Sequence, residues 1–163
     1  MDGQEGGADP GEFTCKATLV KNDKGEDEWE LEGYKWFSSN ARYADFFITM
    51  AVTDPDNPPY QRMSMFLVPA DTPGIINKRN VALGYQAEHE GSHAYLEYRD
   101  VRVPKENMLG DRGGAFVVAQ TRLGGGRIHH AMRTVQLAPQ RIAAHASRAL
   151  LARAGNPHNL AGA

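Results

Sequence analysis

The sequence predicts a mainly β protein: an antiparallel β-barrel or β-sandwich domain followed by one or two α-helices. Two observations lead to this prediction. Short runs of β-branched and aromatic residues, separated by polar turns, repeat from Phe13 to Val103 with no helical period between them. After Gly114 the apolar residues recur instead at the three- and four-residue spacing of a helix. Many short strands joined by turns are typical of a sandwich or barrel.

The first two strands are predicted to form a hairpin. Residues 13–21 are rich in residues that favour strands, and residues 22–27 form a polar turn with asparagine, aspartate and glycine. In residues 28–32, Trp29 and Leu31 alternate with glutamates, which is the pattern of a strand with one buried face. We therefore expect the two runs to pair across the turn.

Further strands follow at short intervals. Turns that contain polar residues, proline or glycine separate four more segments of strand character: residues 34–38, 46–52, 63–68 and 94–103. Four apolar side chains of these runs are expected to face the core: Phe47, Val52, Phe66 and Val68. A helix across residues 44–70 would contradict the whole assignment.

The C-terminal part is predicted to be helical, with two interruptions. Gly124–Gly126 indicate either a break in the helix or a group that closely approaches its backbone, because each glycine costs roughly 1 kcal/mol relative to alanine. Pro139 is expected to break or kink the helix. The chain then divides into four parts: a disordered or frayed start (1–12), a β-domain (13–110), the helical part (111–155) and a frayed tail (156–163).

Composition excludes several classes of protein. Hydrophobic residues make up 41% and charged residues 23% of the chain, as in ordinary globular domains. No apolar run approaches about 18 residues, so no membrane span is expected. The N-terminus lacks the basic and apolar regions of a secretory signal, which leaves a cytoplasmic location as the default. Cys15 is the only cysteine, so no intrachain disulfide or cysteine-rich zinc site can form.

Charge is distributed unevenly along the chain. Residues 1–100 hold 18 acidic and 9 basic residues, a balance of −9, and residues 101–163 hold 2 acidic and 9 basic residues, a balance of +7. The basic part suits either an anionic ligand or pairing with the acidic part. No aromatic residues alternate with its arginines, so a nucleic-acid partner is not expected.

His89, Glu90 and His93 match a zinc-peptidase pattern, with two histidines four positions apart and a glutamate beside the first. On a helix the two imidazoles would share one face and bind a single zinc ion. Gly91 and Ser92 disfavour that helix, and strand-like alternation follows. We therefore favour a turn that leads into a strand, with no metal site, and keep the peptidase as a less favoured alternative.

Trp36, Phe37 and Ser38 form the most informative cluster. Trp36 and Phe37 are predicted to lie in one strand with their rings on opposite faces, so one ring can fill the core and the other needs a separate partner. A planar ring close to a hydroxyl group suits the edge of a flavin. Packing in the core and at an interface is the alternative explanation.

Several segments, in order and at matching intervals, resemble the middle β-domain and first bundle helix of the acyl-CoA dehydrogenases: Gly33–Asn40, Ala44–Asp45, Phe66–Gly74, Asp100–Gly110 and Gly114–Phe116. The resemblance covers roughly residues 13–135. The segment Gly126–Thr134 (Arg-Ile-His-His-Ala-Met-Arg-Thr after the glycine) resembles one branch of this family.

The resemblance implies an FAD-dependent α,β-dehydrogenation of acyl-CoA thioesters, with a hydride passing to flavin N5. It implies FAD between the β-domain and a C-terminal four-helix bundle, an electron-transfer flavoprotein as partner, and a homo-oligomer in the full-length protein. Trp36, Phe37 and Ser38 would bind the cofactor, with Ser38 bonding N5. Arg127 would lie in the substrate site, where a guanidinium suits an oxygen-rich CoA ester.

The sequence departs from the family at the catalytic base. Most members place the catalytic glutamate far along the bundle, and a minority place it at the position of Gly126, which has no side chain here. No matching base is present, so we expect a fragment that is inactive alone. A non-catalytic binding or assembly module with the same barrel is the alternative. From Gln136 onward the sequence also leaves the family pattern, through either a shifted reading frame or ordinary divergence.

Overall fold

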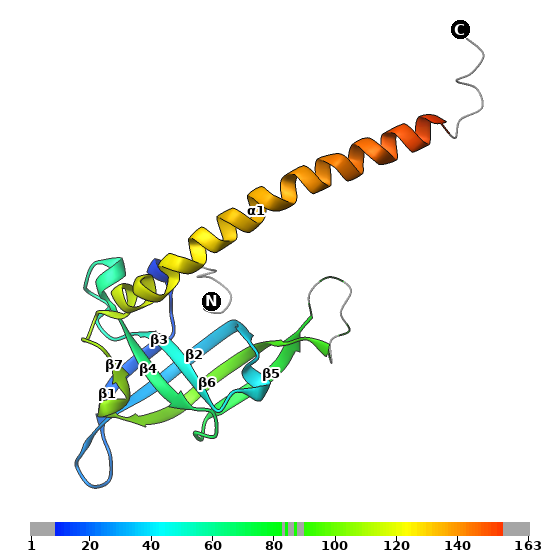
Figure 1. Ribbon diagram of the computed structural model, residues 1–163. Coiled ribbons are helices and arrows are strands. Elements are labelled where there is room, and N and C mark those ends of the chain that lie inside the picture. The colour runs from blue at the N-terminus through cyan, green and yellow to red at the C-terminus, as the bar shows by residue number, and fades with distance from the viewer. Residues whose placement is uncertain (1–8, 83, 85–86, 88–89, 155–163) are drawn as a thin grey trace. The chain divides into compact units, whose positions relative to one another are not determined.

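The computed structural model describes residues 9–82, 84, 87 and 90–154. One seven-stranded sheet with the order β5-β6-β2-β1-β3-β4-β7 dominates it (Figure 1). Its strands are β1 (Lys16–Lys21), β2 (Asp27–Ser39), β3 (Phe46–Val52), β4 (Met63–Pro69), β5 (Ile75–Val81), β6 (His93–Pro104) and β7 (Met108–Leu109). Short 3₁₀ turns are η1 (Pro10–Glu12), η2 (Ala41–Tyr43), η3 (Pro59–Gln61) and η5 (Lys105–Asn107). The mainly β class is confirmed.

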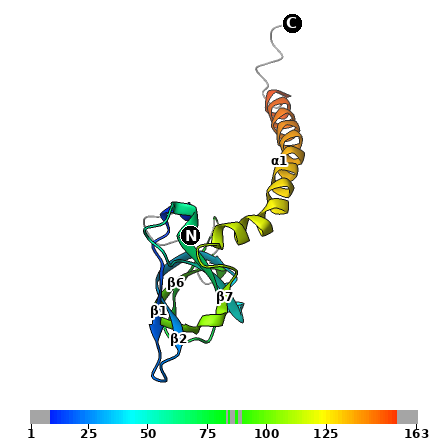
Figure 2. The same cartoon turned by 90° about the vertical axis from the view of Figure 1, so that its left-hand side faces the viewer.

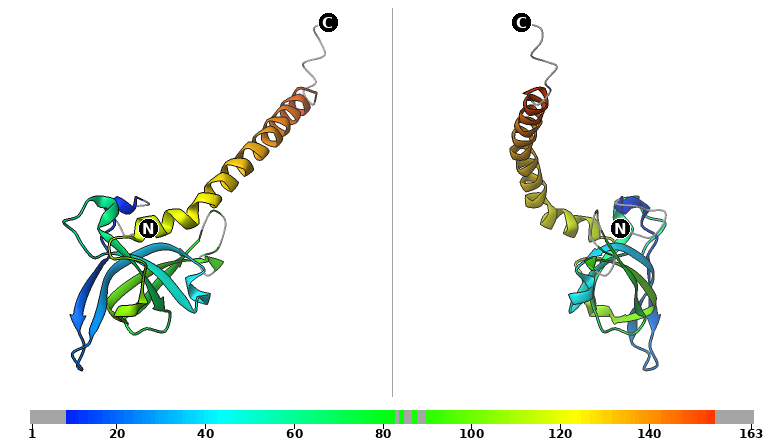
Figure 3. Two further views of the ribbon diagram at one scale, coloured as in Figure 1. Left: turned by 60° about the vertical axis from the view of Figure 1, so that its left-hand side comes forward. Right: turned by 90° about the vertical axis from the view of Figure 1, so that its right-hand side faces the viewer.

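The strands curl, but the sheet does not close (Figures 2 and 3). They enclose two clusters of buried apolar residues, the larger of which is the core. Neighbouring strands are antiparallel, except that β1 and β3 meet in parallel through Lys16 and Val52. The core contains Trp29, Leu31, Phe66, Val68, Leu96, Val101 and Val103. Of the four predicted core residues, Phe66, Val68 and Val52 are buried, and Phe47 is partly buried against the core.

Two strands differ from the sequence prediction. Strand β2 is a single 13-residue strand that joins the two predicted runs 28–32 and 34–38. Strand β5 was not predicted, because its centre carries four polar residues, Asn77–Asn80, in place of an alternating pattern. It lies at the edge of the sheet, where polar and charged side chains keep the unpaired strand edge from associating with other chains.

The turn into β5 depends on Gly74. Its φ is +93°, and a Cβ there would lie 2.1 Å from the carbonyl oxygen of Arg99 on β6. Only glycine combines this backbone conformation with such a close approach. The turn is closed by a hydrogen bond that the Arg99 N–H donates to the Gly74 carbonyl oxygen.

Helix α1 (Ala115–Ala154) is continuous through Gly124–Gly126 and Pro139, so the expected breaks at these points do not occur. Among the described residues, no group outside the helix's own neighbouring backbone approaches the three glycines either, since a Cβ on any of them would meet nothing within 4 Å. The glycines together cost about 3 kcal/mol relative to alanine. Starting a new helix after a break costs more, on the order of 4 kcal/mol, because helix nucleation is unfavourable.

The chain divides into two compact units, Met1–Ala119 and Gln120–Ala163. The first contains the sheet and the start of α1, and the second contains the rest of the helix. Among the described residues, no helix has the length and apolar character needed to cross a membrane.

Candidate functional site

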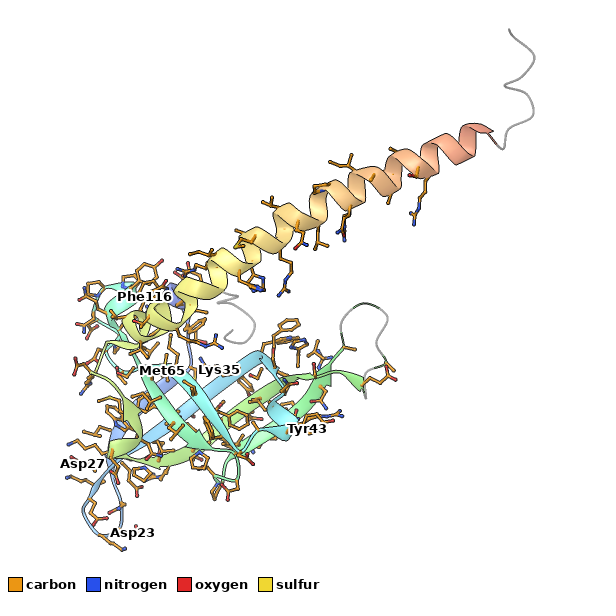
Figure 4. All side chains as sticks on the ribbon, in the orientation of Figure 1. Asp23, Asp27, Lys35, Tyr43, Met65 and Phe116 are labelled. Atoms are coloured by element: carbon orange, nitrogen blue, oxygen red, sulfur yellow. The ribbon has the colours of Figure 1, made fainter. Side chains whose placement is uncertain are left out.

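A pocket of about 450 Å³ lies in the first unit, and its lining comes mainly from β2 and β3. It brings together all three residues that the sequence predicted to bind a cofactor: Trp36, Phe37 and Ser38. Figure 4 labels Lys35, which also lines the pocket. The full lining is Phe13, Lys35, Trp36, Phe37, Ser38, Ser39, Ala44, Phe46, Phe47, Ile48, Thr49, Met50 and Tyr98.

A β-bulge in strand β2 shapes this pocket. Lys35 pairs with Leu96 and Ser38 with Ala94, so β2 has one more residue than β6 between these two points. Phe37 absorbs the extra residue with a φ of 55°, a conformation rare for a bulky side chain. The prediction that Trp36 and Phe37 point to opposite faces is therefore wrong: their ring centroids are 5.9 Å apart and both line the pocket.

The indole of Trp36 sits among other rings but leaves its polar atom unused. Its ring centroid lies 4.6 Å from that of Tyr95, and the guanidinium of Arg79 lies over the indole at 5.4 Å. The indole Nε1 is buried and has no hydrogen-bond partner among the described residues. Because a buried N–H without an acceptor is costly, the described residues leave this donor unsatisfied.

Two serine hydroxyl groups line the pocket, and they differ in their hydrogen bonding. Ser38 is half-buried, and its hydroxyl makes no hydrogen bond to any described residue. The Ser39 hydroxyl lies 2.9 Å from Nδ1 of His93, at the start of β6. Ser38 therefore has its full hydrogen-bonding capacity for a ligand, whereas Ser39 already shares its hydroxyl with a histidine.

Sequence reasoning missed several polar residues of this pocket. Buried Lys35 donates from Nζ to the carbonyl oxygen of Met50 at 2.6 Å and lies 4.5 Å from the centre of the Phe13 ring. Tyr98 and Thr49 share a hydroxyl hydrogen bond of 2.9 Å. Burial raises the pKa of Tyr98 to about 12, so its phenol stays neutral. No local sequence signal marks these residues, because the sheet brings them together from distant strands.

The predicted substrate residue, Arg127, lies in the second unit on α1, where its side chain is exposed. Gly126 precedes it, with open space around its Cα. The apolar side chains at the predicted helical spacing, Ile128, Met132 and Val135, are also exposed. The role of Arg127 stays a prediction.

The zinc-peptidase pattern does not have the helix it needs. Gly91 and Ser92 are not helical, and His93 begins strand β6. His89 lies outside the described residues. Within the described part of the chain, no cluster of three histidine, cysteine or acidic side chains is arranged to hold a metal ion.

Comparison with known proteins identifies the fold around this pocket. Residues 3–101 match the family model of the acyl-CoA dehydrogenase middle domain. The chain therefore belongs to the acyl-CoA dehydrogenase family.

Among curated proteins, it is 40% identical over 124 residues to the probable acyl-CoA dehydrogenase FadE2 of Mycobacterium tuberculosis, covering 74% of this chain and 30% of that protein. It is 38% identical over 128 residues to human acyl-CoA dehydrogenase family member 11, covering 76% of this chain and 16% of that one. An acyl-CoA dehydrogenase crystal structure from Geobacillus kaustophilus superposes with a TM-score of 0.59 at 31% identity. That match covers 75% of this chain and 31% of the other. The chain thus spans less than a third of the length of these relatives.

The pocket has the chemistry that a flavin ring requires. An isoalloxazine is a planar aromatic system whose nitrogen and carbonyl oxygen atoms accept hydrogen bonds. The pocket supplies aromatic rings from Trp36 and Phe37 and a Ser38 hydroxyl without a partner among the described residues. The residues present therefore fit the cofactor that the family resemblance implies.

Proposed function

We propose that this chain is the flavin-contacting part of an FAD-dependent acyl-CoA dehydrogenase, which introduces an α,β double bond into acyl-CoA thioesters. One observation carries the proposal: the bulge in β2 collects Trp36, Phe37 and Ser38 on a single pocket. Membership of the family supports it.

Each residue of the pocket has a distinct proposed task. Trp36 and Phe37 would contact the isoalloxazine through their rings and exclude water from it. The Ser38 hydroxyl would donate a hydrogen bond to one of its acceptor atoms. FAD, when bound, supplies the two-electron acceptor for the hydrogen that leaves the acyl chain.

The proton that leaves the acyl α-carbon needs a base from elsewhere. Gly126, at the position where a minority of the family carries the glutamate, offers no side chain. We propose that the base comes from a segment outside these residues, and that Arg127 contributes charge to the substrate site. Transfer of electrons to an electron-transfer flavoprotein and assembly into a homo-oligomer belong to the same proposal.

The glycine at position 126 also favours a second function, a non-catalytic module that keeps the barrel and has lost dehydrogenation. The two proposals differ at the pocket. In a dehydrogenase the Ser38 hydroxyl forms a hydrogen bond with the flavin, whereas an assembly module does not need this hydrogen bond.

The test is Ser38→Ala in a full-length dehydrogenase that carries these residues as its middle domain. The change removes one hydroxyl and should preserve the fold. It should cost one hydrogen bond, about 0.5–1.5 kcal/mol of flavin binding, and shift the visible spectrum and reduction potential of the flavin. Unchanged flavin binding and potential would remove Ser38 from the site. Thr72→Ala is the matched control, because the Thr72 hydroxyl donates to the Pro69 carbonyl oxygen and Thr72 does not line the pocket.

A further inference from the structure

His93 is connected to the pocket through a hydrogen bond with Ser39. Its Nδ1 lies 2.9 Å from the Ser39 hydroxyl oxygen, and its ring packs edge-on against Phe37, with centroids 6.1 Å apart. Ser39 lines the pocket, whereas His93 does not. His93 can therefore influence a ligand there without touching it.

The β-bulge creates this pair. Beyond the bulge, Ser39 lies directly opposite His93 in the antiparallel register. Without the extra residue, the register that pairs Lys35 with Leu96 would place Ser38 opposite His93 instead. The ladder continues with a backbone hydrogen bond of 2.6 Å from the Asn40 N–H to the Ser92 carbonyl oxygen, which holds the two strands together beside the pair.

The presence or absence of a proton on Nδ1 of His93 determines whether the Ser39 hydroxyl can donate a hydrogen bond to a ligand in the pocket. A serine hydroxyl has one proton to donate. If Nδ1 carries no proton, Ser39 donates to it and presents only lone pairs to the pocket. If Nδ1 is protonated, it donates to Ser39 Oγ, and the Ser39 O–H is released to donate elsewhere.

We propose that His93 is a positioning residue of the flavin pocket: its Nδ1–H holds Ser39 Oγ and directs the Ser39 O–H toward the bound ligand. The inference rests on the proposed function, because an isoalloxazine presents nitrogen and carbonyl oxygen acceptors. Binding of FAD then favours the ring form of His93 in which Nδ1 carries a proton.

The first measurement follows the His93 ring directly in the 163-residue chain. Long-range ¹H–¹⁵N spectra distinguish protonated from unprotonated ring nitrogens. Adding FAD should move His93 toward the form protonated at Nδ1, whereas His129 and His130, which lie on α1, should not change. An Nδ1 that stays unprotonated at saturating FAD would overturn the proposal.

The second measurement compares the FAD affinity of several variants. The indole N–H signal of Trp36 reports the binding. His93→Phe keeps the ring against Phe37 but removes Nδ1, and should weaken FAD binding roughly 2- to 10-fold. His93→Asn places an amide near the position of Nδ1 and should restore most of the loss. Ser39→Ala should weaken binding as much as His93→Phe, and the double variant no further, because the two residues act as a unit.

The outcomes separate this proposal from the one on which it rests. If FAD leaves the Trp36 signal of the wild-type chain unchanged, both proposals fail. If wild-type FAD binding is intact but His93→Phe binds equally well, or if the Ser39 and His93 losses add, only the role of His93 is overturned. Ser38→Ala is the control, since its effect should add independently to that of His93→Phe.

Discussion

Phe37 has an unusual backbone for its size. Its φ of 55° places a bulky side chain in the left-handed region, at a cost of roughly 1–3 kcal/mol. Such conformations persist only where the surrounding structure holds them, here through the bulge between β2 and β6. The strain places the aromatic ring at the pocket, with 38% of its surface exposed.

Replacing Phe37 by glycine should separate stability from binding. Phe37→Gly should change the free energy of unfolding by less than about 1 kcal/mol, because relief of strain offsets the lost partial burial. Trp36→Gly should cost more than about 2 kcal/mol, since it removes the contact with Tyr95. Urea denaturation measures both values. Equal losses in the two variants would show that the backbone at Phe37 is not strained.

Asp27 links several elements through charge. Its carboxylate lies 2.5 Å from the ammonium of Lys21, at the end of β1, and 2.9 Å from that of Lys105 in η5. Hydrogen bonds from Lys21 and Lys105 lower the pKa of Asp27 to about 2. These ion pairs connect the β1–β2 hairpin to η5, which follows β6.

This depressed pKa predicts a pH dependence with a definite sign. The ion pairs stabilise the fold above the ordinary aspartate pKa of about 4, and this contribution disappears as pH falls from about 4 to about 2. In Lys105→Met, the carboxyl titration of Asp27 in ¹³C NMR should move upward from about 2. Lys24→Met, in the exposed turn, is the control. An Asp27 midpoint near 4 in the wild-type chain would refute the linkage.

Across the whole chain, the predicted strands and helices were most accurate where the pattern of apolar and polar residues was regular. The predicted strand from Phe46 to Val52 has the same bounds as β3, because a continuous apolar run between polar turns marks both of its ends. The bulge at Phe37 and the pairing of Ser39 with His93 depend on a register between distant strands, which local alternation cannot reveal. The continuity of α1 through Gly124–Gly126 reflects the cost of starting a helix anew, which outweighs single-residue propensities.

The chain alone should not dehydrogenate acyl-CoA. General-base catalysis typically contributes 10²–10⁴-fold, and Gly126 supplies no base. Apolar side chains such as Ile128 and Met132 are exposed and should promote association. We expect FAD to bind this chain only weakly and to be removed by gel filtration, so the preparation should be colourless and should give no turnover with acyl-CoA, FAD and an artificial electron acceptor. A yellow, monomeric preparation that turns over acyl-CoA would place the complete site within these residues.

The central claim, that the pocket beside Trp36 receives a flavin, is tested most directly by the two indole N–H signals of this chain. Both Trp29 and Trp36 have a buried Nε1 without a partner among the described residues, but only Trp36 lines the pocket. FAD titrated into the ¹⁵N-labelled chain at millimolar concentration should shift the Trp36 indole signal together with the Phe37 and Ser38 amides, and leave the Trp29 indole signal in place. An unmoved Trp36 signal, with the spectrum otherwise that of the folded chain, would contradict the assignment of this pocket to the flavin.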